Sequence, residues 1–166
     1  MSELKPQGLK KSQILLYGFF GMFLNTFYLM FLAYNRLFYL TNVLQLSTQI
    51  SAVVNTLSVW GNVVTMLLAG AIIEKFTFKS GKFRTWTVIG GIVVGITFTL
   101  LFANFGLSQG VAGALFVVMF VIQSIGYNTL WVAERSLVGP MSTTAADANS
   151  LAMVAQQGST LGGLIY

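Results

Sequence analysis

The stretch SAVVNTLSVWGNVVTMLLAGAIIEKFTFKSGKFRTW, residues 51–86, joins an apolar run to a short basic connection and to the start of another apolar run. Residues 50–73 carry no charge, and they outnumber the ~20 residues that a helix needs to cross a bilayer. Uncharged polar residues recur along this run at spacings of three and four, which places them on one helix face: Ser51, Asn55, Ser58, Asn62 and Thr65. The stretch therefore predicts a membrane-spanning helix with one polar side.

The composition extends this interpretation to the whole chain, because 55% of the residues are hydrophobic and only 8% are charged. Soluble domains are about 25% charged. The absence of Cys and His excludes thiol catalysis and the common zinc ligand sets. The acidic residues are too few for carboxylate-pair catalysis: Glu3, Glu74, Glu134 and Asp147. We expect an integral membrane protein that is no enzyme, with no metal site and no cofactor.

Apolar runs of spanning length predict an all-α, polytopic transmembrane helical bundle over residues 1–166. The expected helices cover roughly 14–40, 50–73, 86–107, 111–138 and 149–166. The last run stops at Tyr166 without an exit loop. We therefore expect a fragment truncated before a sixth helix, and a complete five-helix protein is the alternative.

Basic residues occur in alternate connections between the apolar runs, as the positive-inside rule describes. They occur before the first run and between the second and third runs: Lys5, Lys10, Lys11, Lys75, Lys79, Lys82 and Arg84. The other two connections, 41–49 and 106–110, contain no Lys or Arg. This pattern places the N-terminus and the 74–85 loop in the cytoplasm, with the bundle in the plasma membrane. The net charge of +5 then reports topology, and no nucleic-acid partner is expected.

Polar faces also occur on other expected helices, and the third run is the exception. Its Gly91 and Gly95 form a small-xxx-small pair that allows close helix packing. The polar faces either pair with one another within the bundle or line a water-filled cavity. We favour the cavity because aromatic rings beside amides suit a polar organic solute. The proposed contacts are Asn25, Tyr28, Asn62, Thr65, Tyr127, Asn128, Trp131 and Gln156.

The connection after residue 73 carries the most specific pattern. Gly70-x-x-x-Glu74 followed by Gly81-Lys82-Phe83-Arg84 resembles the loop motif of the major facilitator superfamily. The form GKFR-x-W, with "YGFF", "FYLTNVLQLS" and "GYNTLWVAERSLVGPMS", resembles the glycoside–pentoside–hexuronide:cation symporters, the melibiose-permease-like family. Ala133 stands where that family usually has Pro. The resemblance covers essentially the whole chain.

The resemblance implies a twelve-helix transporter whose two six-helix halves alternate access to a central site, with this chain supplying most of the N-terminal half. The second-helix acids that hold the cation in that family correspond to Asn62 and Met66. Its first-helix acid that contacts sugar corresponds to Asn25, its fourth-helix acid falls at or beside Trp131, and its fifth-helix Arg falls near Gln156. Sodium usually needs at least one carboxylate among its oxygen ligands, so cation coupling at this place is doubtful.

Charged residues near the membrane faces carry further expectations. Gly70, Glu74, Gly81, Lys82, Arg84 and Glu134 form the expected cytoplasmic loop motif and gate. Glu134 either titrates or pairs with Lys82 or Arg84, and we favour the pairing. Arg135 and Arg36 are expected to reach the headgroups as anchors, with a solute contact as the alternative for Arg36.

The leading hypothesis is a secondary transporter of a neutral polar solute, a sugar or glycoside, embedded in membrane lipid. Coupling to sodium or protons, where it exists, would reside in the half of the protein not represented here. The alternative is a non-transporting, degenerate or regulatory relative that kept the fold and lost the site.

Overall fold

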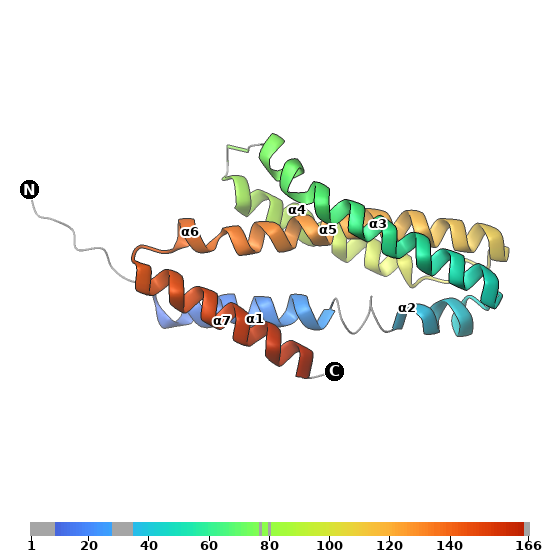
Figure 1. Cartoon of the computed structure of the whole chain (residues 1–166), viewed down its shortest axis with the longest axis horizontal. Coiled ribbons are helices and arrows are strands. Elements are labelled where there is room, and N and C mark those ends of the chain that lie inside the picture. The colour runs from blue at the N-terminus through green and yellow to red at the C-terminus, as the bar shows by residue number, and fades with distance from the viewer. Residues whose placement is uncertain (1–8, 28–34, 77, 80, 165–166) are drawn as a thin grey trace, which may run out of the picture. The chain divides into compact units, whose positions relative to one another are not determined.

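The computed structural model describes residues 9–27, 35–76, 78–79 and 81–164, without the side chains of residues 25 and 27. The chain forms two units: residues 35–135, and residues 1–34 together with 136–166. All regular elements in the described ranges are helical (Figure 1). The expected all-α class is therefore confirmed, and each unit is described separately.

The unit formed by residues 35–135 contains two short and three long helical elements. The short ones are α2 (Asn35–Phe38) and the π-helical turn η2 (Tyr39–Val43). The long ones are α3 (Thr48–Lys75), α4 (Lys82–Leu101) and α5 (Gln109–Ser136). In the part of the chain that is described, α3, α4 and α5 with its extension to Met141 are long and apolar enough to cross a membrane.

The start of α3 is defined by side chains that satisfy backbone groups. The Ser47 hydroxyl accepts a hydrogen bond from the Ile50 amide at 3.4 Å, as an N-cap residue does. At the start of α5, the Gln109 amide group donates to the Gln45 carbonyl at 2.9 Å and accepts from the Ser47 amide at 3.3 Å. Gln109 thereby ties the N-terminal ends of α3 and α5 together.

The connection between α3 and α4 turns at Gly81, whose φ of 103° is a conformation that side chains with a Cβ rarely adopt. The Trp86 indole N–H donates to the Phe76 carbonyl at 3.2 Å, and the Trp86 ring meets the Phe78 ring edge-on, with centroids 5.6 Å apart. This aromatic contact closes the turn.

Helix α4 ends at Leu101, before the bound of 107 that hydropathy suggested. The Asn104 side chain accepts a hydrogen bond from the Gly106 amide at 3.0 Å, and Gly106 has a φ of 65°. Asn and Gly favour this turn over a further helical turn, so the apolar residues Phe105 and Leu107 lie in the loop.

The close approach of α4 to α5 occurs at a different glycine from the expected pair. A Cβ on Gly90 would lie 2.8 Å from the Gly126 carbonyl oxygen and 2.9 Å from Leu130 Cβ. A Cβ on Gly91 or Gly95 would meet nothing within 4 Å. The spacing of Gly91 and Gly95 allows close packing, but spacing does not say which face of the helix meets a neighbour, and in the described structure that face contains Gly90.

Helices α3 and α5 run parallel, and their contacts advance together along both sequences. A Cβ on Gly113 would lie 3.0 Å from Val54, and one on Gly61 would lie 2.7 Å from Val121. Large apolar side chains on the other faces of these helices remain exposed, with Trp60 at 65% and Leu67 at 78%. Exposed apolar faces of this kind suit a lipid environment.

The other unit contains α1 (Lys11–Phe27), α6 (Val138–Met141) and α7 (Ala145–Leu164). Tyr17, Leu151 and Ala155 form its buried core. Helices α1 and α7 approach closely, because a Cβ on Gly162 would lie 2.7 Å from Thr26 Oγ1. The Thr26 hydroxyl also donates to the Gly162 carbonyl at 3.1 Å.

The expected first and fifth runs therefore correspond to elements with different bounds. The first run, 14–40, corresponds to α1, α2 and the start of η2, and residues 28–34 lie outside the described part. Helix α7 begins at Ala145, ahead of the expected 149, because Asp147 and Thr144 cap its first turn: the Asp147 amide donates to the Thr144 hydroxyl at 3.1 Å. On the described residues, neither α1 nor α7 meets the length and hydropathy of a spanning helix.

Candidate functional site

The polar stripe of α3 is largely satisfied inside the unit that contains it. The Ser58 hydroxyl donates to the Val54 carbonyl at 2.7 Å, and Ser51 donates to the Leu46 carbonyl at 3.4 Å. Such local bonds remove the cost of a buried hydroxyl. These two serines are buried and belong to helix packing, which matches the alternative in which polar faces pair within the bundle.

The other end of the stripe forms a hydrogen-bonded cluster with α5. The Asn128 side-chain amide donates to Thr65 Oγ1 at 2.9 Å and to Asn62 Oδ1 at 3.1 Å. Thr65 in turn donates to the Asn62 carbonyl at 3.0 Å. Three of the predicted solute contacts, Asn62, Thr65 and Asn128, are thus brought together by the parallel alignment of α3 and α5.

This cluster carries no formal charge. Asn128 and Thr65 are buried and Asn62 is half-buried. Met66, which the resemblance pairs with Asn62, is 64% exposed and supplies no oxygen. Neutral amides and hydroxyls fit a hydroxyl-bearing solute better than a cation, which would need a carboxylate.

Aromatic rings extend along α5 beyond the cluster. Tyr127 stacks on Trp131 with centroids 6.1 Å apart and an interplanar angle of 25°. The Arg135 guanidinium lies 4.7 Å from the centre of the Trp131 ring, a cation–π contact. The same Arg135 places its Nε 3.3 Å from the Glu134 carboxylate, which is fully buried.

The contact between Glu134 and Arg135 differs from the expected arrangement. Adjacent helix positions point in different directions, which suggested that Arg135 extends alone to the headgroups. Instead its long side chain turns back over Trp131 and reaches the neighbouring carboxylate. Sequence position could not reveal this contact, because backbone direction does not determine where a flexible guanidinium ends.

Arg36 also enters the helix packing instead of acting only as an anchor. Its Nε donates to Asn55 Oδ1 at 2.9 Å, and its guanidinium lies 4.9 Å from the centre of the Phe120 ring. Arg36 therefore links α2 to both α3 and α5. It also occupies Asn55, the remaining member of the α3 stripe.

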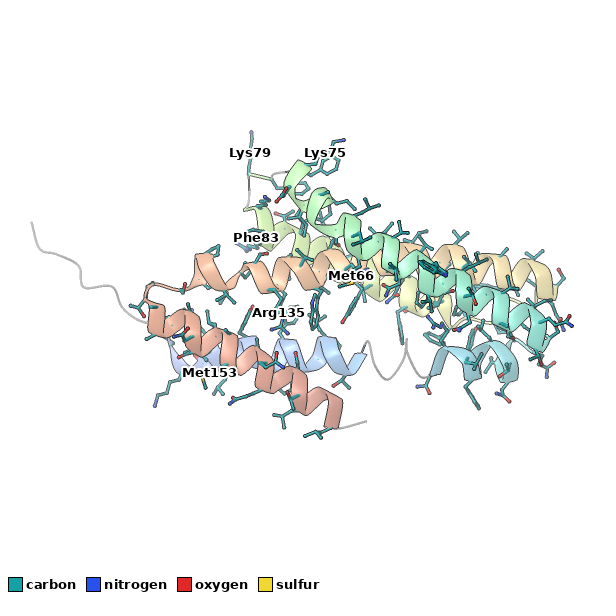
Figure 2. All side chains as sticks on the ribbon, viewed as in Figure 1. Met66, Lys75, Lys79, Phe83, Arg135 and Met153 are labelled. Atoms are coloured by element: carbon teal, nitrogen blue, oxygen red, sulfur yellow. The ribbon has the colours of Figure 1, made fainter. Side chains whose placement is uncertain are left out.

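The predicted loop motif lies at the turn between α3 and α4, where Figure 2 shows Lys75 and Lys79. Glu74 and Arg84 are exposed and Lys82 is half-buried. Gly81 meets its expected role through its positive φ. A Cβ on Gly70 would meet nothing within 4 Å, so no close approach in the described structure requires a glycine there.

The remaining predicted contacts belong to the other unit. Gln156 is exposed on α7, where a shallow hollow of about 540 Å³ is lined by Met153, Gln156, Gln157, Thr160 and Leu161. Asn25 lies in α1, but its side chain is outside the described residues, and Tyr28 is entirely outside them. The polar side chains of Gln156, Gln157 and Thr160, set in a largely apolar lining, make this face of α7 a second candidate surface for a solute.

Sequence reasoning missed one buried polar residue in the unit formed by residues 35–135. Gln123 on α5 is fully buried, yet it was not among the predicted contacts. Its spacing of four residues before Tyr127 places it on the same helix face, and this signal could have identified it from the sequence.

Comparisons with known proteins identify the family of this chain. The family model described as "MFS/sugar transport protein" matches residues 12–166. The chain is similar to the raffinose carrier protein of Pediococcus pentosaceus, with 32% identity over 98 residues, 57% of this chain and 15% of that protein. It is also similar to the lactose permease of Lactobacillus delbrueckii subsp. bulgaricus, with 27% identity over 106 residues, 61% of this chain and 17% of that protein. The chain thus spans less than a fifth of either relative, and no solved structure matches it.

Proposed function

The chain belongs to the MFS/sugar transport protein family, and on that premise we propose that it forms part of a secondary transporter for a sugar or glycoside. The predicted superfamily membership is confirmed by this match, and the family is one of transporters, not of enzymes. In such transporters the solute binds near the middle of the bilayer and becomes accessible from each side in turn. The family and the three apolar helices also make it an integral membrane protein.

The observation that carries the proposal is the uncharged cluster of Asn62, Thr65 and Asn128, next along α5 to the Tyr127–Trp131 stack. A sugar offers hydroxyl groups for amides and hydroxyls, and a face of C–H groups for aromatic rings. We propose that Asn128 Oδ1 accepts a hydrogen bond from a solute hydroxyl. Asn25, Tyr28 and Gln156 remain further proposed contacts.

The two relatives support a sugar as the solute. One is a raffinose carrier and the other a lactose permease, and both solutes are neutral and rich in hydroxyls. The cluster has no carboxylate to balance a bound sodium ion, so we propose that it does not hold the coupling cation. Coupling to sodium or protons, if present, involves residues elsewhere in the complete protein.

Orientation is a further part of the proposal. The basic residues of the α3–α4 turn, Lys75, Lys79, Lys82 and Arg84, favour a cytoplasmic location for that turn in the plasma membrane. We propose that Lys82 and Arg84 compete with Arg135 for the buried Glu134 carboxylate, and that this exchange forms a cytoplasmic gate. A buried carboxylate needs a cationic partner in each state.

Uptake measurements test the function directly. The complete protein in proteoliposomes should accumulate or equilibrate labelled raffinose or lactose, measured with and without sodium and proton gradients. Replacing Asn128 by Ala removes the bonds to Asn62 and Thr65 and the proposed contact to the solute, so we expect the KM for the sugar to rise by tenfold or more. Thr99→Ala is the matched control, because the exposed Thr99 hydroxyl bonds only to the carbonyl of Gly95 in its own helix.

A non-transporting relative is the second candidate, and the internal pairing of the α3 stripe favours it. Such a protein would show no uptake of either sugar and no thermal stabilisation by it, in the wild type as in Asn128→Ala. Sugar-dependent stabilisation of the wild type that Asn128→Ala abolishes would exclude this candidate.

A further inference from the structure

The side-chain amide of Gln123 is enclosed without a hydrogen-bonding partner. The residue is fully buried, and neither Oε1 nor Nε2 has a hydrogen bond within the described structure. An amide can donate two hydrogen bonds and accept others. Burying it with none of them made is unfavourable in a protein interior and in a membrane. A residue of this kind therefore points to a partner that the chain itself does not supply.

Packing between helices does not account for Gln123. An amide that holds two membrane helices together does so through a hydrogen bond, as Asn128 does with Asn62 and Thr65. Gln123 lies five residues before Asn128, so at about 100° per residue the two side chains leave α5 roughly 140° apart. Gln123 therefore faces away from the Asn128 cluster and is not a member of it.

The neighbours of Gln123 along its own face are aromatic. Phe120 lies three residues before it and Tyr127 four residues after it, spacings that place side chains next to each other on a helix. The Arg36 guanidinium covers the Phe120 ring, and Tyr127 stacks on Trp131. The amide thus interrupts a row of rings on α5, the combination of hydrogen-bonding edge and flat apolar face that a sugar ring requires.

We propose that Gln123 is a solute-binding residue whose amide hydrogen-bonds hydroxyl groups of the transported sugar between the rings of Phe120 and Tyr127. This inference rests on the proposed function and adds a specificity-determining contact to it. Because the side chain is enclosed here, the sugar reaches it in a conformation that opens this face of α5, as alternating access requires. The solute then forms the hydrogen bonds that the Gln123 amide lacks in this structure.

The test replaces Gln123 by Met, which keeps the length and volume of the side chain but removes its polar atoms. Removing a buried amide that has no partner should leave the thermal midpoint of the sugar-free protein unchanged or raise it. The sugar site loses its contact, so the KM for raffinose or lactose should rise by about tenfold or more with a smaller change in kcat. Gln49→Met is the matched control, because Gln49 is exposed at the start of α3.

The outcomes separate this inference from the function on which it rests. Wild-type protein that neither takes up nor is stabilised by raffinose or lactose refutes the proposed function and this inference with it. Wild type that responds to the sugar, with Gln123→Met having an unchanged KM, refutes only the role of Gln123. A clear fall in the midpoint of Gln123→Met, or its failure to fold, also overturns the inference, because the amide would then have a structural partner.

Discussion

The contact between α4 and α5 can be tested with two adjacent glycines, Gly90 and Gly91, each replaced by Ala. Both substitutions add the same methyl group to the same helix, one residue apart. The Cβ of Gly90→Ala would lie 2.8 Å from the Gly126 carbonyl oxygen and 3.2 Å from Leu130 Cα. The Cβ of Gly91→Ala would meet nothing within 4 Å. The pair therefore separates helix packing from helix propensity.

The expected free energies follow from these distances. Both variants gain about 0.8–1.0 kcal/mol from replacing Gly by Ala in a helix interior. At Gly90 the nearest atoms include backbone, which cannot move aside as a flexible side chain can, so overpacking costs about 1–3 kcal/mol. Gly91→Ala should then be more stable than Gly90→Ala by about 1–3 kcal/mol, since the propensity gain is common to both.

Thermal unfolding in detergent, followed by tryptophan fluorescence, measures this difference. For a domain of this size the midpoint shifts by about 2–4 °C per kcal/mol, so Gly90→Ala should unfold below Gly91→Ala by roughly 2–12 °C. Equal midpoints would refute the close approach at Gly90. A lower midpoint for Gly91→Ala would restore the packing face that the Gly91 and Gly95 spacing suggested.

Three further predictions concern orientation, pH and the contact between α2 and α3. The chain has no Cys, so the variants Lys79→Cys and Ser108→Cys each contain a single labelling site. A membrane-impermeant maleimide applied to intact cells should label only Ser108→Cys. Labelling of Lys79→Cys alone would show that the proposed topology is inverted. Hydrogen bonds from Thr143, and then from Thr144 and the Leu9 amide, lower the pKa of Asp147. The contribution of Asp147 to stability should therefore be complete above the ordinary pKa of a carboxyl group and be lost as the pH falls through the lowered pKa. The thermal midpoints of wild type and Asp147→Asn should converge in acid. Arg36→Lys keeps the charge but loses the Nε–H bond to Asn55. This loss should lower the free energy of unfolding by about 1 kcal/mol, measured by denaturant unfolding. An unchanged midpoint would contradict the link between α2 and α3.

Much of the architecture was accessible from hydropathy and a few local residues. The run before Glu74 became α3, and Gly81 adopts the positive φ that its place in the turn implied. Helix ends were less accessible: α4 stops at Leu101 although apolar residues continue past it. Hydropathy measures preference for lipid, whereas Asn104 and Gly106 form a turn through backbone geometry.

The candidate site was also only partly predictable from the sequence. The spacing of Asn62 and Thr65 predicted one polar face, and Asn128 was recognised as a polar residue of another helix. Their hydrogen bonding could not be read from either helix alone, because it depends on the parallel alignment and axial register of α3 and α5. The pairing of Arg36 with Asn55 escaped prediction for the same reason.

Sequence alone determined the membrane environment, the helical class and the neutral character of the α3 face, because these depend on composition and on a period of 3.6 residues. Tertiary structure decided which polar residues of α3 and α5 form hydrogen bonds with one another. Ser58 bonds to a carbonyl of its own helix and Ser51 to Leu46 just before that helix, whereas Asn62 and Thr65 bond to Asn128. Within the described residues, Gln123 stays buried without a hydrogen-bonding partner. Hydrogen bonds require donors and acceptors within about 3 Å, and only the packed helices determine those distances.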